Sequence, residues 1–100
     1  MLPDEIEVTD YHLAALMQYE GALCISCRTG GSDTTWVFRV PQLDAEYIQQ
    51  DFANDETTVF LKSFLKSLNE VASFRNFARR SLSGEWRSER YSEPRVRRTA

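Results

Sequence analysis

The feature that most constrains the fold is a pair of alternating segments, "ALCISCR" and "TTWVFRV", joined by "TGGSD". Alternation of side chains with a period of two is typical of β-strands. The adjacent glycines favour a turn, so the two segments predict an antiparallel hairpin. Pro41 follows directly and ends the second strand, because proline has no N–H to donate to a sheet. A β-hairpin is therefore expected at the centre of the fold.

The same alternation assigns the side chains of the hairpin to its two faces. The expected faces of the first strand are Leu23, Ile25 and Cys27 on one side and Ala22, Cys24 and Ser26 on the other. Trp36, Phe38 and Val40 are expected to share one face of the second strand. Because Cys24 and Cys27 are then on opposite faces, they are expected to form neither a disulfide nor a shared metal site.

Segments with helical periodicity precede and follow the hairpin in the sequence. "YHLAALMQYE" predicts a helix that Thr9 or Asp10 caps and Gly21 ends. Before it, "EIEVT" alternates and is a candidate for a short additional strand. After the hairpin, "QLDAEYIQQDF" predicts a short second helix, and a long third helix is expected from about Thr58 to about Leu82.

The expected third helix changes character along its length. Its first half has a broad apolar face formed by Phe60, Leu61, Phe64, Leu65, Leu68, Val71 and Ala72. Its opposite, polar face comprises Lys62, Lys66, Asn69, Ser73, Asn76 and Arg80. After Ala72, Arg75 and Arg79 take the angular positions that were apolar. The helix is therefore expected to leave the core or to kink near Ala72, with Phe74 and Phe77 on a separate surface.

Together these elements predict an α+β fold: a short helix, an antiparallel β-hairpin with or without a third N-terminal strand, a short helix and a long C-terminal helix. Residues 1–82 are expected to form one small domain. Residues 83–100 contain Gly84, Pro94 and several serines with little apolar periodicity. They are expected to be a disordered, flexible basic tail whose removal leaves the domain folded.

Charge is distributed unevenly. Residues 1–57 contain eleven Asp or Glu and two Lys or Arg, a balance of −9, whereas residues 58–100 contain four and ten, a balance of +6. Such asymmetry indicates an interaction tail or a binding face, or else attraction between the two halves. The acidic start of the chain lacks the pattern of a signal peptide, and no apolar run approaches the ~20 residues of a membrane span. A cytoplasmic protein with reduced cysteines and no membrane contact is therefore expected.

Candidate catalytic and metal chemistry is sparse. Cys24 and Cys27 form a CxxC, but zinc needs further ligands and His12 is the only histidine. No motif marks a nucleophile that His12 would activate. "TGGSD" lacks the longer pattern of a phosphate loop. We therefore expect no enzyme activity, no cofactor and no metal, with both cysteines structural.

The basic C-terminal region is the main candidate for function. Arginine forks pair with phosphate oxygens, and aromatic rings stack on exposed bases. Trp86 and Tyr91 are the candidate stacking residues, whereas Glu85, Glu89 and Glu93 dilute the charge and leave a solubilising tail as the alternative. The predicted binding residues are Lys62, Lys66, Phe74, Arg75, Phe77, Arg79, Arg80, Trp86, Arg87, Arg90, Arg95, Arg97 and Arg98.

From Val8 to about Arg80, the chain resembles a family of short bacterial and phage proteins classed as a domain of unknown function. The resemblance rests on "TDYHLAALMQYEG", on "WVFRV" as the return strand of a hairpin, and on "YIQQDFAND" and "FLKSFLKSLNEV". Members of that family are typically small, standalone proteins, often carried by phages or mobile elements. The resemblance implies no catalytic residues.

Two functions are expected from these observations. The first is a non-enzymatic accessory protein of phage or mobile-element type that binds nucleic acid or a ribonucleoprotein through its basic helix end and tail. The second is a protein-interaction module, of the inhibitor or counter-defence type, that docks on a protein partner through its acidic N-terminal half. Self-association or stable docking on a protein partner is also expected, because a lone hairpin leaves unpaired strand edges and because Phe74 and Phe77 are apolar.

Overall fold

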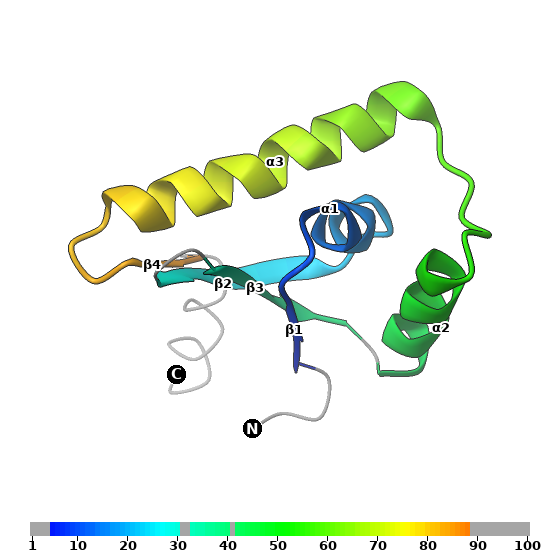
Figure 1. Ribbon diagram of the computed structural model, residues 1–100, viewed down its shortest axis with the longest axis horizontal. Helices are drawn as coiled ribbons and strands as arrows, with labels where there is room; N and C mark the ends of the chain where they lie inside the picture. The colour runs from blue at the N-terminus through cyan, green and yellow to red at the C-terminus, as the bar shows by residue number, and fades with distance from the viewer. Residues whose placement is uncertain (1–4, 31–32, 41, 89–100) are drawn as a thin grey trace, which may run out of the picture.

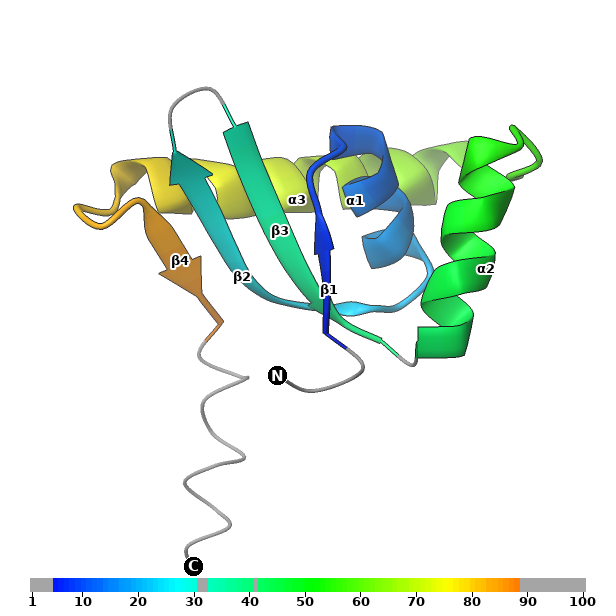
Figure 2. The same cartoon turned by 60° about the horizontal axis from the view of Figure 1, so that its bottom comes forward.

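Four antiparallel strands form one sheet in the order β1-β3-β2-β4 (Figure 2). The computed structural model describes residues 5–30, 33–40 and 42–88. The elements are β1 (Glu5–Val8), α1 (Tyr11–Tyr19), β2 (Leu23–Gly30), β3 (Asp33–Arg39), α2 (Gln42–Ala53), α3 (Leu61–Arg80) and β4 (Glu85–Arg87). This mixture of one sheet and three helices in the described ranges confirms the predicted α+β class and the additional N-terminal strand.

The helices α1 and α3 lie on the same face of the sheet, and α2 lies beyond its β1 edge (Figures 1 and 2). The core fills the space between this face and the two helices. Its largest fully buried side chains are Trp36, Phe38, Met17, Val71 and Cys27. In the described parts of the chain, no helix combines the length and the apolar character that a membrane span needs.

The ends of α1 follow the predicted capping pattern. The Asp10 side chain accepts a hydrogen bond of 2.9 Å from the backbone N–H of Leu13, which satisfies one of the free donors at a helix start. Gly21 follows the helix with φ +96°, a left-handed conformation that glycine adopts without a Cβ clash. Both signals come from residues close to the helix ends in the sequence, which explains why the sequence predicts this helix.

A β-bulge in β2 changes the expected faces of the hairpin. Cys24 lies opposite Phe38 and Cys27 lies opposite Trp36, with a register shift between Cys24 and Ser26. Opposite residues share a face of the sheet, so both cysteines point into the same core, and both are buried. The prediction that they point to opposite faces was wrong, because the extra residue of a bulge resets the alternation. Both are free thiols, and the described residues contain no group of three or more metal-ligating side chains.

Burial of the two thiols predicts a pH-dependent stability. Desolvation raises the pKa of Cys24 from 9.0 to about 12, helped by the neighbouring Cys27, and that of Cys27 to about 11. A raised pKa stabilises the folded state fully below pH 9.0, and this stabilisation is lost as pH rises through the folded-state values. In urea unfolding, the parent should lose more stability between neutral pH and pH 11 than a Cys24→Ala/Cys27→Ala variant. Equal losses would contradict a role for the thiols.

The packing of α3 continues past Ala72. Val71 and Ala78 are both fully buried, so the helix neither kinks nor leaves the core at Ala72, and this prediction was wrong. The sheet and α1 instead cover a different sector of α3 from the one expected. As a result, Leu61 and Leu65, expected on the buried face, are 69% and 46% exposed.

Strand β4 accounts for the longer packing of α3. The prediction that the chain is disordered from Ser83 was wrong for Glu85–Arg87, which pair with β2. Gly84, at φ +74°, makes the turn into β4, and its carbonyl accepts a 2.8 Å hydrogen bond from the N–H of Thr29. The Trp86 ring then stacks on Phe74 with 4.5 Å between ring centres. Residues 89–100 of the predicted tail lie outside the described residues.

Candidate nucleic-acid interface

The solvent-facing side of α3 carries a continuous row of side chains that can donate hydrogen bonds, which we name the donor stripe. Its members recur every three or four residues, the spacing that keeps side chains on one face of a helix. All six are exposed. The donor stripe comprises Lys62, Lys66, Asn69, Ser73, Asn76 and Arg80.

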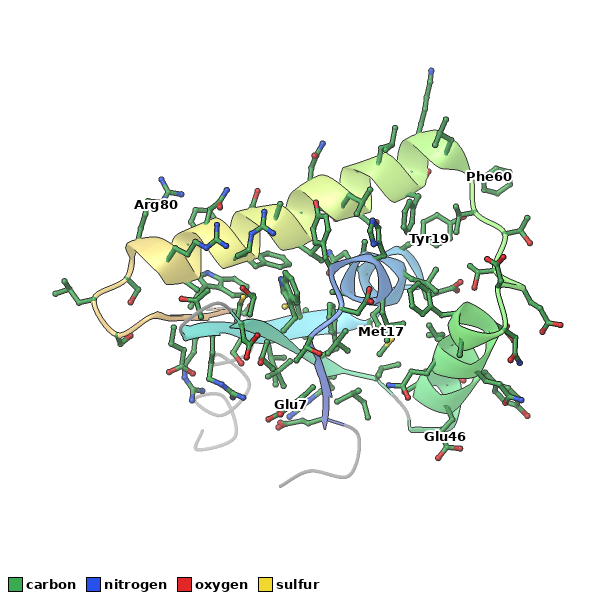
Figure 3. All side chains as sticks on the ribbon, viewed as in Figure 1. Glu7, Met17, Tyr19, Glu46, Phe60 and Arg80 are labelled. Atoms are coloured by element: carbon green, nitrogen blue, oxygen red, sulfur yellow. The ribbon has the colours of Figure 1, made fainter. Side chains whose placement is uncertain are left out.

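The helix holds these side chains outward because its opposite face is buried. Val71 and Ala78 anchor that face in the core, and the Arg80 side chain points away from the sheet (Figure 3). The Arg80 Nε also donates to the Asn76 carbonyl at 3.4 Å. At 1.5 Å per residue, the stripe from Lys62 to Arg80 is about 27 Å long, roughly three quarters of the ~34 Å turn of a DNA duplex.

Acidic side chains are missing from this stripe. The only carboxylate within α3 is Glu70, which is partly buried and accepts a 3.1 Å hydrogen bond from the Gln18 amide of α1. Among the described residues, no carboxylate forms an ion pair with Lys62, Lys66 or Arg80. Within the described residues, no carboxylate therefore neutralises the cations of the donor stripe.

The opposite surface of the sheet has a different electrostatic character. Arg28 pairs with Glu7 at 3.2 Å, and Arg87 pairs with Glu85 at 3.4 Å. A third pair joins Arg39 to a carboxylate of β1 at 3.4 Å. Because these arginines pair with carboxylates, the sheet surface attracts an anionic ligand less strongly than the exposed face of α3 does. Arg87, a predicted binding residue, lies on this surface and not with the donor stripe.

Two of the predicted aromatic contacts are used inside the fold. Phe74 and Trp86 stack on each other, and Trp86 belongs to β4 and not to a flexible tail. Stacking of Trp86 on nucleic-acid bases stays a prediction. Phe77 is 46% exposed, and its ring centre lies 6.4 Å from that of Trp86. Arg75 is partly buried with its guanidinium 5.2 Å from the centre of the Tyr11 ring, a cation–π contact that ties α3 to α1.

The remaining predicted residues divide into two groups. Arg79 is exposed in the last turn of α3, where a cation also interacts favourably with the helix dipole. The predicted binding residues Arg90, Arg95, Arg97 and Arg98, and the candidate stacking residue Tyr91, lie outside the described residues.

Three members of the donor stripe were not predicted as binding residues. Asn69, Ser73 and Asn76 were recognised only as part of a polar face. The signal that could have found them is the spacing itself, because it places uncharged hydrogen-bonding groups between two lysines and an arginine on one helix face. The prediction relied instead on the many arginines that follow residue 73.

Acidic side chains gather around α2 and the segment that leads into α3. A cleft of about 530 Å³ lies between α1, α2 and the segment that follows α2. Its lining includes Glu20, Asp44, Asp51 and Glu56, together with Tyr47, which is 60% exposed. The structure therefore places an acidic region around α2, close to the first turn of α3 and far along the chain from the Arg80 end of the donor stripe.

Comparisons with models of protein families, with curated proteins and with solved structures found no significant match. The resemblance to the family of short bacterial and phage proteins therefore stays a prediction.

Proposed function

We propose that this protein is a non-enzymatic accessory protein that binds nucleic acid, with the donor stripe of α3 lying along the phosphate backbone. The observation that carries this proposal is the charge of the stripe: cations at both ends of one exposed helix face, amide and hydroxyl groups between them, and no carboxylate. Lysine and arginine bind phosphate as charged donors, and asparagine and serine also contact phosphate oxygens.

The proposed mode of binding differs from the one that the sequence suggests. The stripe sits on a helix anchored by buried residues, so the backbone that carries its side chains is positioned before the ligand arrives. A preorganised surface loses less conformational entropy on binding than a flexible tail does. The resemblance to phage and mobile-element proteins adds the expectation that the nucleic acid, or a ribonucleoprotein, belongs to such an element in the cytoplasm.

The test is a pair of variants with equal loss of charge. Lys66→Gln/Arg80→Gln removes two cations from the stripe, and Arg28→Gln/Arg87→Gln removes two paired cations from the sheet surface. Binding of the full chain to a short DNA duplex, single-stranded DNA and single-stranded RNA is measured at two salt concentrations. The stripe variant should bind about tenfold more weakly than the parent, and its salt dependence on duplex should fall by about 2 in logarithmic slope.

The sheet variant should bind nearly as tightly as the parent. Equal weakening by both variants would mean that binding follows net charge and not the geometry of α3. Unchanged binding by the stripe variant would contradict the proposal.

The acidic cleft supports the second function, docking on a basic protein partner. Asp51→Asn/Glu56→Gln changes the charge of that cleft and leaves the donor stripe intact. Loss of a protein partner by this variant in nuclease-treated extracts, with unchanged binding to nucleic acid, would favour the second function.

A further inference from the structure

The start of α3 presents the most exposed aromatic side chain of the described hydrophobic set. Phe60 is 80% exposed and Leu61 is 69% exposed, and we name this pair the apolar knob. Figure 3 shows the Phe60 ring pointing away from the body of the molecule. The backbone around it is held in place, because the Phe60 N–H donates to the Tyr19 hydroxyl at 3.0 Å and its carbonyl accepts from the N–H of Phe64 at 2.9 Å.

An apolar groove lies beside the knob. It has a volume of about 310 Å³ and is formed by α1, the end of α2 and the start of α3. Its apolar lining is Leu16, Phe52, Val59 and Phe64, and Asp55 also contributes to it. Binding pockets for apolar groups begin at about 300 Å³, so the groove has room for an aromatic side chain.

Knob and groove are adjacent in the chain. Val59 lines the groove, and the next residue, Phe60, forms the knob. A twofold rotation that brings one knob into the groove of a second molecule therefore also brings the second knob into the first groove. Such a self-complementary patch is the requirement for a symmetric dimer.

We infer that the occupant of the groove is a second copy of this chain, with Phe60 of each copy inserted into the groove of the other. Charge complementarity supports this occupant. Lys62 follows the knob in the first turn of α3, and Asp55 lines the groove. Insertion of Phe60 therefore brings Lys62 towards Asp55 of the partner subunit, once on each side of the axis.

The inferred dimer uses a different surface from the one that the sequence predicts for self-association. Phe74, one of the two residues expected to drive it, is partly buried and stacks on Trp86. The sheet has four strands and not a lone hairpin, so the argument from a two-stranded sheet also no longer holds. Lys62 belongs both to the donor stripe and to the inferred dimer interface. Lys66 and Arg80, whose variants test the proposed function, lie outside the knob and groove, so the two proposals can be tested separately.

Sedimentation equilibrium of the full chain, from micromolar to millimolar concentration, tests the inference. The parent should form a dimer. Phe60→Ser should weaken the dimer about tenfold or more, as loss of a buried aromatic anchor does. The variant should still fold, because Phe60 is exposed and occupies the N-cap position of α3 without a side-chain capping hydrogen bond, a position that serine favours. The matched control is Leu82→Ser, which removes another fully exposed apolar side chain at the opposite end of α3.

A charge pair tests the groove side of the same interface. Lys62→Glu should weaken the dimer, because the new carboxylate meets Asp55 of the partner subunit. Asp55→Asn in the Lys62→Glu background should restore part of the affinity, and asparagine tolerates the left-handed backbone at this position, where φ is +59°. A monomeric parent, a Phe60→Ser variant that dimerises like the parent, or equal weakening by Leu82→Ser would each overturn the inference.

Discussion

Replacing Trp36 by alanine is expected to lower the free energy of unfolding by about 4 kcal/mol, the cost of removing a large aromatic side chain from a core. Trp36 is 2% exposed and packs between β1, β2 and α3. Its indole N–H also donates a 2.9 Å hydrogen bond to the carbonyl of Val71, which joins the sheet directly to α3. Truncation therefore leaves a cavity and removes a tie between the two layers.

Urea unfolding followed by circular dichroism measures this effect. Trp36→Phe keeps most of the packing and loses the hydrogen bond, so its cost should be smaller, about 1–2 kcal/mol. The exposed control Leu82→Ala should stay within about 0.5 kcal/mol of the parent. A Trp36→Ala variant as stable as this control would contradict the position of Trp36 in the core.

Truncation of the chain after Leu82 is expected to destabilise the fold by about 3 kcal/mol relative to truncation after Ser88. The shorter chain loses β4, so Phe74 loses its stacking partner and the edge of β2 is exposed. Loss of a packed aromatic residue together with a strand of ladder hydrogen bonds accounts for this magnitude. The sequence alone predicts the opposite, a domain that stays folded without residues 83–100.

Single substitutions separate packing from chain length. Trp86→Ala in the full chain should cost about 2 kcal/mol, less than core tryptophans because the side chain is only partly buried, and Trp86→Phe should cost less. Thermal unfolding of the two truncated chains and the two variants tests this set. If truncation after Leu82 leaves the melting temperature unchanged, β4 does not contribute to stability.

Most elements of the fold could be predicted because their signals are local. Asp10 and Gly21 bound α1 through contacts within a few residues, and β3 pairs with β1 without a register shift. The faces of β2 could not be predicted, because the bulge between Cys24 and Ser26 follows from pairing with β3. Periodicity assumes an uninterrupted ladder, and one extra residue reverses every assignment before it.

The candidate site was predicted only in part, for a similar reason. Lys62, Lys66 and Arg80 were predicted as binding residues, and the structure places them on one exposed face with Asn69, Ser73 and Asn76. Phe74 and Trp86 were predicted as binding residues because no sequence pattern indicates that their side chains contact each other. Their contact joins α3 to a strand of three residues, which is too short for periodicity to detect.

By itself, the sequence determined the element types, the α+β class and the polar face of α3, because each depends on interactions between residues close in the chain. Only the tertiary structure decided which sector of α3 is buried. The apolar sector of its first half is broader than the surface that the sheet and α1 cover, so Val71 and Ala78 are enclosed while Leu61 and Leu65 stay exposed. Burial depends on which surfaces meet, and those surfaces come from residues distant in the sequence.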